Sequence, residues 1–168
     1  MKTIYLLRHA KSSWKDDELS DRDRPLKHKG HFQAEMMSSH LSTLLPAPQK
    51  VLCSPARRTR ETFAYFQQAW NLKPAQVHFE PSLYLAVWKD LFQAVQSLSG
   101  SKEILMLVGH NPGLTDFARK LLCAESEELE TLRTCAFLQF DFEVASWKEI
   151  TPHTGRLKLT LRPKDLER

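Results

Sequence analysis

One continuous apolar run constrains the fold of this chain more than any other feature. It lies in the segment Glu103–Val108, whose last five residues are Ile-Leu-Met-Leu-Val. A strand buried on both faces has a continuous apolar sequence of this length, and such strands are typical of parallel sheets covered by helices. We therefore predict an α/β domain with three layers, α/β/α, and place this strand near the middle of a mostly parallel sheet.

The preceding and following segments alternate between short apolar runs and helical stripes of apolar residues. The pattern predicts strands at residues 3–7, 51–53 and 77–79, and helices at residues 25–45, 55–70, 87–98 and 112–122. A proline is expected in the first turn of three of these helices, at Pro25, Pro55 and Pro112, and Ser54 is expected to cap the second helix. Residues 11–24 have no apolar period and are expected to form a long binding loop.

Two segments near the C-terminus alternate apolar and polar residues. They are Cys135–Glu143 and Arg156–Arg162. An alternation with period two predicts antiparallel strands with one side facing water, and it places Leu157, Leu159 and Leu161 on one face. We expect these two strands to complete the sheet.

Length and cysteine content limit the class of protein. A chain of 168 residues is expected to form one domain, residues 1–168, and can bury roughly 70% of its unfolded surface. Its three cysteines are far apart in sequence, which argues against a disulfide framework and against paired zinc ligands. No apolar run has the length of a signal-peptide core or a membrane span. We therefore expect a cytoplasmic protein without membrane association, and we also expect a monomer.

The positive charge of the chain is mild and spread over its whole length, with two denser clusters. The formal net charge is +4, and basic residues are densest at residues 11–29 and at Arg57, Arg58 and Arg60. No nucleic-acid-binding motif accompanies this charge, and an anionic small substrate explains local arginine clusters equally well. We therefore expect no nucleic-acid partner.

Three of the predicted strands lead into basic side chains. Arg8 and His9 follow the first strand, Arg58 lies in the first turn of the helix after the second, and His110 follows the central strand. The carboxyl ends of parallel strands meet at one edge of a sheet, and the N-termini of helices attract anions. We therefore expect these four side chains to form a single anion site.

The side chains expected at this site suit phosphoryl transfer. Guanidinium groups bind phosphate oxygens through paired N–H donors, and an imidazole can attack phosphorus to form a covalent phosphohistidine. Lys11, Ser12 and Lys15 follow closely in the sequence and are expected to bind phosphate or substrate. No Asp or Glu directly follows these strand ends, so we expect neither a metal ion nor another cofactor.

A cysteine-dependent phosphatase is an alternative at the second strand end, where Cys53 lies. That mechanism needs a nucleophilic cysteine, five intervening residues and then an arginine. Thr59 occupies the position that the arginine would need. We therefore interpret Cys53 as a buried strand residue.

Several segments carry a resemblance to a known family. They are Arg8-His9-Ala10, Asp23-Arg24-Pro25-Leu26, residues 54–62 with the sequence Ser-Pro-Ala-Arg-Arg-Thr-Arg-Glu-Thr, and Gly109-His110. In type and order they resemble the histidine phosphatase superfamily, also called phosphoglycerate mutase-like. The short chain, with no large cap insertion, and the sequence of residues 7–14 are similar to the small SixA-type phosphohistidine phosphatases. The resemblance implies a phosphoglycerate mutase-like fold and phosphatase activity.

The resemblance also implies a role for each matching residue. His9 would be the nucleophile, Arg8 and Arg58 would bind the phosphoryl group, and His110 would donate a hydrogen bond to it.

At three further positions the comparison is less direct. Ser12 stands where the family has a pocket serine, whereas Lys15 stands where many members have asparagine. Ala10 replaces the usual glycine of the triplet, and its methyl group limits how closely the backbone can approach the phosphate.

The most informative departure concerns the proton donor. Phosphomonoesterases and mutases of the superfamily generally use a Glu or Asp after the third strand, where this chain has Leu85. An alkoxide leaving group needs that proton, whereas the imidazole of a phosphohistidine can be protonated beforehand on its other nitrogen. Absence of the acid therefore favours protein phosphohistidine as the substrate.

Two other functions stay open. A small phosphorylated metabolite would be the substrate of a phosphomonoesterase, with Glu80 or Asp90 as the possible acid. A binding module that keeps the phosphate pocket without turnover is the third reading of the same residues.

Overall fold

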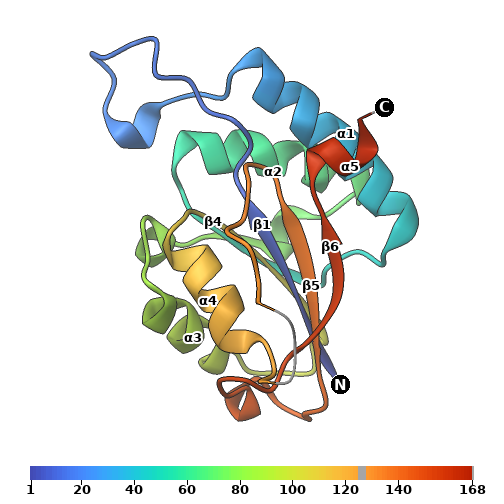
Figure 1. Ribbon diagram of the computed structural model, residues 1–168. Helices are drawn as coiled ribbons and strands as arrows, with labels where there is room; N and C mark the ends of the chain where they lie inside the picture. The colour runs from blue at the N-terminus through green and yellow to red at the C-terminus, as the bar shows by residue number, and fades with distance from the viewer. Residues whose placement is uncertain (125–127, 168) are drawn as a thin grey trace.

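The computed structural model describes residues 1–124 and 128–167, and within them a six-stranded sheet lies between two layers of helices (Figure 1). The strands are β1 (Lys2–Arg8), β2 (Lys50–Cys53), β3 (Val77–Phe79), β4 (Ile104–Gly109), β5 (Phe137–Phe142) and β6 (Arg156–Leu161). Their order across the sheet is β3-β2-β4-β1-β5-β6. The first four strands along the chain are parallel, and β5 and β6 are antiparallel additions. This arrangement confirms the predicted mostly parallel sheet with antiparallel C-terminal strands.

Helices cover both faces of the sheet (Figure 1). On one face lie α1 (His28–Leu44), α2 (Arg57–Ala69) and α5 (Pro163–Leu166), and on the other lie α3 (Trp88–Gln96) and α4 (Gly113–Leu121). Short 3-10 turns occur at Asp21–Asp23, Pro74–Gln76, Pro81–Leu83 and Trp147–Glu149. None of the helices within the described part of the chain has both the length and the apolar composition needed to cross a membrane.

The sheet has an apolar core on each face, which explains the continuous apolar sequences of β1 and β4. Tyr5 and Leu7 pack in the core under α1 and α2, whereas Ile4 and Leu6 pack in the core under α3 and α4. Because successive strand residues point to opposite faces, a strand between two helical layers needs apolar side chains at every position.

The register of the parallel strands brings their carboxyl ends together. Arg8 lies opposite Gly109 in the β1–β4 ladder, and Cys53 lies opposite Val108 in the β2–β4 ladder. The residues that follow β1, β2 and β4 therefore leave the sheet at the same edge.

Every predicted strand and helix is present, and their ends agree with the prediction within about two residues except at the start of α1. That helix begins at His28 rather than Pro25. Leu26 forms a β-bridge with Ser12, and its N–H donates to Glu61 Oε1 at 2.9 Å. Since tertiary contacts hold the chain extended there, the local proline signal does not start the helix.

The start of α2 also differs from the prediction. The helix begins at Arg57 with Ala56 at the N-cap, two residues after Pro55. Ser54 does not cap this helix, because its hydroxyl lies 2.7 Å from Nε2 of His110 instead. The predicted capping residue therefore belongs to the candidate site.

The leucines of β6 do not all point to the same face of the sheet. Its ladder with β5 has a one-residue irregularity, so that Gln139 lies opposite Leu159 while the next residue, Phe140, lies opposite Leu157. Leu157 packs with the core under α3 and α4, whereas Leu159 and Leu161 pack with the other core. The prediction that these three leucines share one face was wrong, because a bulge reverses the alternation of faces.

Candidate active site

His9 follows β1 directly and is buried, with 7% of its surface exposed. Its Nδ1 donates to the carbonyl oxygen of Ala10 at 2.7 Å, because a carbonyl can only accept. Burial lowers the pKa of His9 to about 3 even though this hydrogen bond favours the charged form, and the nearby His110 and Arg8 lower it further. At neutral pH the ring is therefore uncharged, with its lone pair on Nε2.

His110 follows β4 and faces His9, with the two ring centroids 5.4 Å apart. Burial and the positive charge of Arg58 lower the pKa of His110 to about 4, so this ring is also neutral. The Ser54 hydroxyl lies 2.7 Å from Nε2 and accepts from the N–H of Ala56 at 3.4 Å; we therefore assign it as a donor to Nε2 and the ring hydrogen to Nδ1. That Nδ1 is buried and has no hydrogen-bond partner among the residues that the structure describes.

Arg8 and Arg58 approach the two histidines from β1 and from the first turn of α2. Arg8 Nη1 donates to the carbonyl oxygen of Leu132 at 3.0 Å. Arg58 is only 3% exposed, and its Nη1 donates to the backbone oxygen of Asp21 at 2.7 Å. In both guanidinium groups Nε is buried and has no hydrogen-bond partner within residues 1–124 and 128–167.

Three N–H donors are thus buried and unpaired within the described residues: Arg8 Nε, Arg58 Nε and His110 Nδ1. They come from the ends of β1 and β4 and from the start of α2, which are the elements expected to meet. An unsatisfied buried donor costs about 1–3 kcal/mol, so three of them favour binding of a group with several acceptor oxygens. A phosphoryl group has that number of acceptors and the complementary charge.

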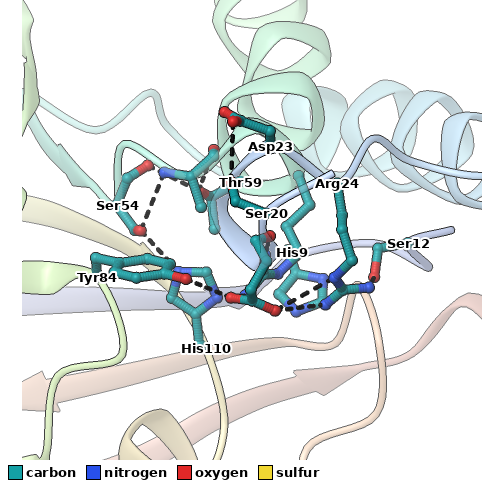
Figure 2. Close-up of polar contacts among 12 residues, drawn as sticks. His9, Ser12, Ser20, Asp23, Arg24, Ser54, Thr59, Tyr84 and His110 are labelled. Atoms are coloured by element: carbon teal, nitrogen blue, oxygen red, sulfur yellow. Dashed lines mark hydrogen bonds and ion pairs between the residues drawn. The ribbon is translucent and has the colours of Figure 1, made fainter. Parts of the chain in front are cut away.

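An aspartate that the sequence did not single out lies at the same place. Asp21 is on the 3-10 turn of the long loop, and its Oδ2 accepts hydrogen bonds from Arg58 Nη2 at 3.1 Å and from the Tyr84 hydroxyl. Its Oδ1 accepts from Nε and Nη2 of Arg24 at 3.2 and 3.1 Å. Figure 2 shows His9, Arg24, Tyr84 and His110 converging from different parts of the chain.

These contacts determine the charge of Asp21. Its partial burial raises the pKa of the carboxyl, but the hydrogen bonds from Tyr84 and Arg58 outweigh this effect and lower that pKa to about 2. Asp21 is therefore ionised at neutral pH. No local pattern could have identified it, because it lies in a loop without periodicity and reaches the site only through the fold.

Of the three loop residues expected to bind phosphate or substrate, one contacts the cluster and two have exposed side chains. Ser12 joins the cluster, since its Oγ accepts from Nη1 of Arg24 at 2.9 Å. Lys11 and Lys15 are exposed, and a phosphate-binding role for them stays a prediction. Ala10 is fully buried in the core under α1 and α2, and its N–H donates to Thr62 Oγ1 at 2.9 Å, so the protein accommodates its methyl group.

The structure does not bring the expected acids to this cluster. Glu80 and Asp90 line a separate groove of about 520 Å³ beside β2, and Asp90 caps α3 by accepting from the N–H of Val87 at 3.1 Å. Leu85, at the position of the usual acid, is 54% exposed. Its neighbour Tyr84 is the residue of that segment that contacts the cluster, with its ring edge-on to His110 at 5.6 Å.

Neither a metal site nor a reactive cysteine accompanies these residues. Within residues 1–124 and 128–167, no group of three or more His, Cys, Asp or Glu side chains is arranged to hold a metal ion. Cys53 is fully buried, and burial raises the pKa of its thiol, so it does not form a thiolate nucleophile.

Comparison with known sequences identifies relatives over most of the chain. The family model described as histidine phosphatase superfamily (branch 1) matches residues 4–84. An uncharacterized chloroplastic protein of Arabidopsis thaliana is 36% identical over 160 residues, which is 90% of this chain and 72% of the relative. An uncharacterized protein of Mycobacterium leprae is 32% identical over 118 residues, covering 68% of this chain and 70% of the relative.

Comparison with solved structures supports the same fold. The protein histidine phosphatase SixA, solved with tungstate, superposes with a TM-score of 0.81 at 19% identity and covers 98% of this chain and 99% of its own. A mycobacterial glucosyl-3-phosphoglycerate phosphatase superposes with a TM-score of 0.66 at 14% identity, covering 95% and 98%. At these identities the likeness is one of fold.

Proposed function

The chain belongs to the histidine phosphatase superfamily, and from this premise we propose that it is a phosphatase that forms a covalent intermediate on His9 and acts on protein phosphohistidine. The observation that carries the proposal is the set of three unpaired buried donors, on Arg8, Arg58 and His110, beside the uncharged His9 ring. A nucleophile with a free lone pair and donors for the phosphoryl oxygens are the two requirements of this chemistry.

In the first step, Nε2 of His9 attacks phosphorus. The new N–P bond forms while the N–P bond of the substrate breaks, and its electron pair stays on the leaving nitrogen. The substrate imidazole departs as a neutral ring, because its other nitrogen already carries a proton. The hydrogen bond from His9 Nδ1 to Ala10 O holds the ring hydrogen on Nδ1, so that Nε2 of the free enzyme carries the lone pair that attacks.

In the second step, water attacks the phosphohistidine: a new O–P bond forms while the bond from Nε2 of His9 to phosphorus breaks, its electron pair returns to Nε2, and inorganic phosphate leaves. Asp21 takes the proton of this water, and its role is supported by its ionised state and by its place beside Arg58, Arg24 and Tyr84. Arg58 links the two steps, since its Nη atoms hold Asp21 while its Nε is available to the phosphoryl group.

The same charge state of Asp21 supports the choice of substrate. A carboxyl with a pKa of about 2 holds no proton for a leaving alkoxide at neutral pH. General acid catalysis contributes about 10²–10⁴-fold, and a phosphomonoester would lose that factor here. A phosphohistidine does not depend on it.

Trapping of the phosphoenzyme tests the proposal. The protein is incubated with a ³²P-labelled phosphohistidine peptide and quenched, and acid-labile, base-stable label is measured. Label is expected on the wild type and not on His9→Ala, whereas a matched change at the exposed His78 (His78→Ala) keeps it.

Two results would contradict the proposal. Tight phosphate binding with neither trapped label nor turnover would identify a phosphate-binding module. Hydrolysis of an aryl phosphate as fast as that of the phosphohistidine peptide would identify a phosphomonoesterase.

A further inference from the structure

A groove of about 510 Å³ runs along α2, between the 3-10 turn at Asp21–Asp23 and the end of β3. We call it the α2 groove. Its lining includes Arg22, Pro55, Arg60, Phe63, Gln67 and Phe79.

The periodicity of α2 separates this groove from the candidate site. Arg60, Phe63 and Gln67 follow one another at spacings of three and four residues, which places them on one side of a helix. Arg58 and Thr62 are buried on another side, where Arg58 contacts Asp21 and Thr62 accepts from the N–H of Ala10. One helix therefore supplies both a phosphate-binding arginine and the wall of a neighbouring groove.

The α2 groove combines positive charge with an exposed aromatic ring. Arg22 and Arg60 line it, and within the part of the chain that the structure describes neither forms an ion pair. Asp23 also lines the groove, where its carboxylate accepts a hydrogen bond from Ser20 at 2.9 Å and keeps its negative charge, so that the two arginines leave the charged lining residues with a net positive charge. Phe79 is 46% exposed at the far end.

The groove borders the candidate site. The guanidinium of Arg22 lies over the ring of Tyr84, 5.7 Å from its centroid, and that ring contacts His110. Pro55 directly follows Ser54, the hydrogen-bond partner of His110. A polypeptide bound in the groove would therefore lie next to residues that contact the candidate site.

We propose that the α2 groove binds the polypeptide on one side of the phosphorylated residue, with acidic side chains at Arg22 and Arg60 and an apolar side chain on Phe79. This inference rests on the proposed function and names its substrate class more closely: an acidic phosphoprotein segment rather than a free metabolite. Charge complementarity carries it, because two unpaired guanidinium groups beside a partly apolar surface match acidic and apolar residues together.

Two phosphohistidine peptides test the inference. One has flanking glutamates and a leucine, and in the other the glutamates are replaced by glutamines. The wild type is expected to have a kcat/KM about threefold to tenfold higher for the acidic peptide, as two exposed charge pairs together can supply. High salt is expected to reduce this preference.

Variants of the lining residues test whether the preference for the acidic peptide arises in the α2 groove. Arg60→Glu is expected to abolish or reverse it, and Phe79→Ser is expected to lower kcat/KM for both peptides relative to that for free phosphohistidine. Dividing by the value for free phosphohistidine removes any general loss of activity. The matched control is Arg156→Glu, because Arg156 is 70% exposed on β6, at the opposite edge of the sheet.

The outcomes separate the two proposals. Equal kcat/KM for the two peptides in the wild type, or the same change in Arg60→Glu and Arg156→Glu, would overturn the docking groove. Turnover of free phosphohistidine without turnover of either peptide would also overturn it. Failure to turn over free phosphohistidine, together with no trapped label, would instead overturn the proposed function.

Discussion

Arg58 contacts Asp21 and also has a donor for the phosphoryl group, so both the assigned base and the phosphate-binding part of the candidate site depend on it. Its side chain is fixed by the backbone oxygen and the carboxylate of Asp21, at 2.7 and 3.1 Å, while its Nε is unpaired. A planar guanidinium can bind one partner along one edge and a second partner along another. Lysine at this position would keep the charge but could not bridge the two groups.

Asp21 gives the sharpest prediction at the scale of single residues. Asp21→Asn keeps the size of the side chain but removes the base that we assign to the second step. Attack of phosphohistidine on His9 is expected to continue while hydrolysis of the phosphoenzyme slows by on the order of 10²-fold. Rapid-quench measurements should therefore show labelled protein accumulating in a burst.

Asp17→Asn is the control, because Asp17 is exposed in the same loop. If the variant at Asp21 hydrolyses its phosphoenzyme at the wild-type rate, Asp21 is not the base.

Residues at strand ends could be predicted from the sequence, and loop residues could not. His9 and His110 meet because each follows a parallel strand that pairs with the other, and the sheet fixes that edge. Asp21 and Arg24 reach the same place through a long loop whose path no local pattern determines. Glu80 follows the edge strand β3 and lines a groove beside β2 and α3. Its position directly after a strand was therefore not enough to place it in the candidate site.

At the scale of elements, the long loop is held to the start of α1 by main-chain contacts. Lys27 N–H donates to Lys11 O at 2.9 Å, and Leu26 bridges Ser12. Gly30 permits this approach, because a Cβ there would lie 2.1 Å from Lys11 O. These contacts also explain why proline failed to predict the start of the helix, since they hold an extended segment where the sequence favours a turn of helix.

The substitution Gly30→Ala tests this packing. In an exposed helix the change would stabilise by about 1 kcal/mol through helix propensity. Here the clash is expected to lower the free energy of unfolding by about 1–3 kcal/mol and to weaken phosphate binding, because Ser12 and Arg24 move with the loop. Urea unfolding and phosphate titration measure the two effects.

Glu35→Ala, at an exposed position of the same helix, supplies the control. If Gly30→Ala instead raises the free energy of unfolding, the loop at Lys11 can move away from the added methyl group without destabilising the protein.

At the scale of the whole molecule, the candidate site makes folding depend on pH. Burial lowers the pKa of His9 to about 3 and that of His110 to about 4, from an ordinary value near 6.5. Below pH 6.5 the unfolded chain therefore binds protons that the folded chain does not. Stability is then lost as the pH falls from about 6.5 toward the folded-state pKa values.

The size of this loss can be measured where other groups contribute little. Between pH 7.5 and pH 5.5 the two histidines together are expected to lower the free energy of unfolding by about 2–3 kcal/mol. The depressed pKa of Asp21, about 2, acts in the same direction but only below about pH 4.

Urea unfolding at the two pH values should give this difference in the wild type and a much smaller one in the double variant His9→Asn/His110→Asn. His78→Asn, at an exposed histidine, should keep the wild-type difference. An unchanged difference in the double variant would mean that burial does not lower the pKa values of these two rings, and burial would then not be what keeps His9 neutral near pH 6.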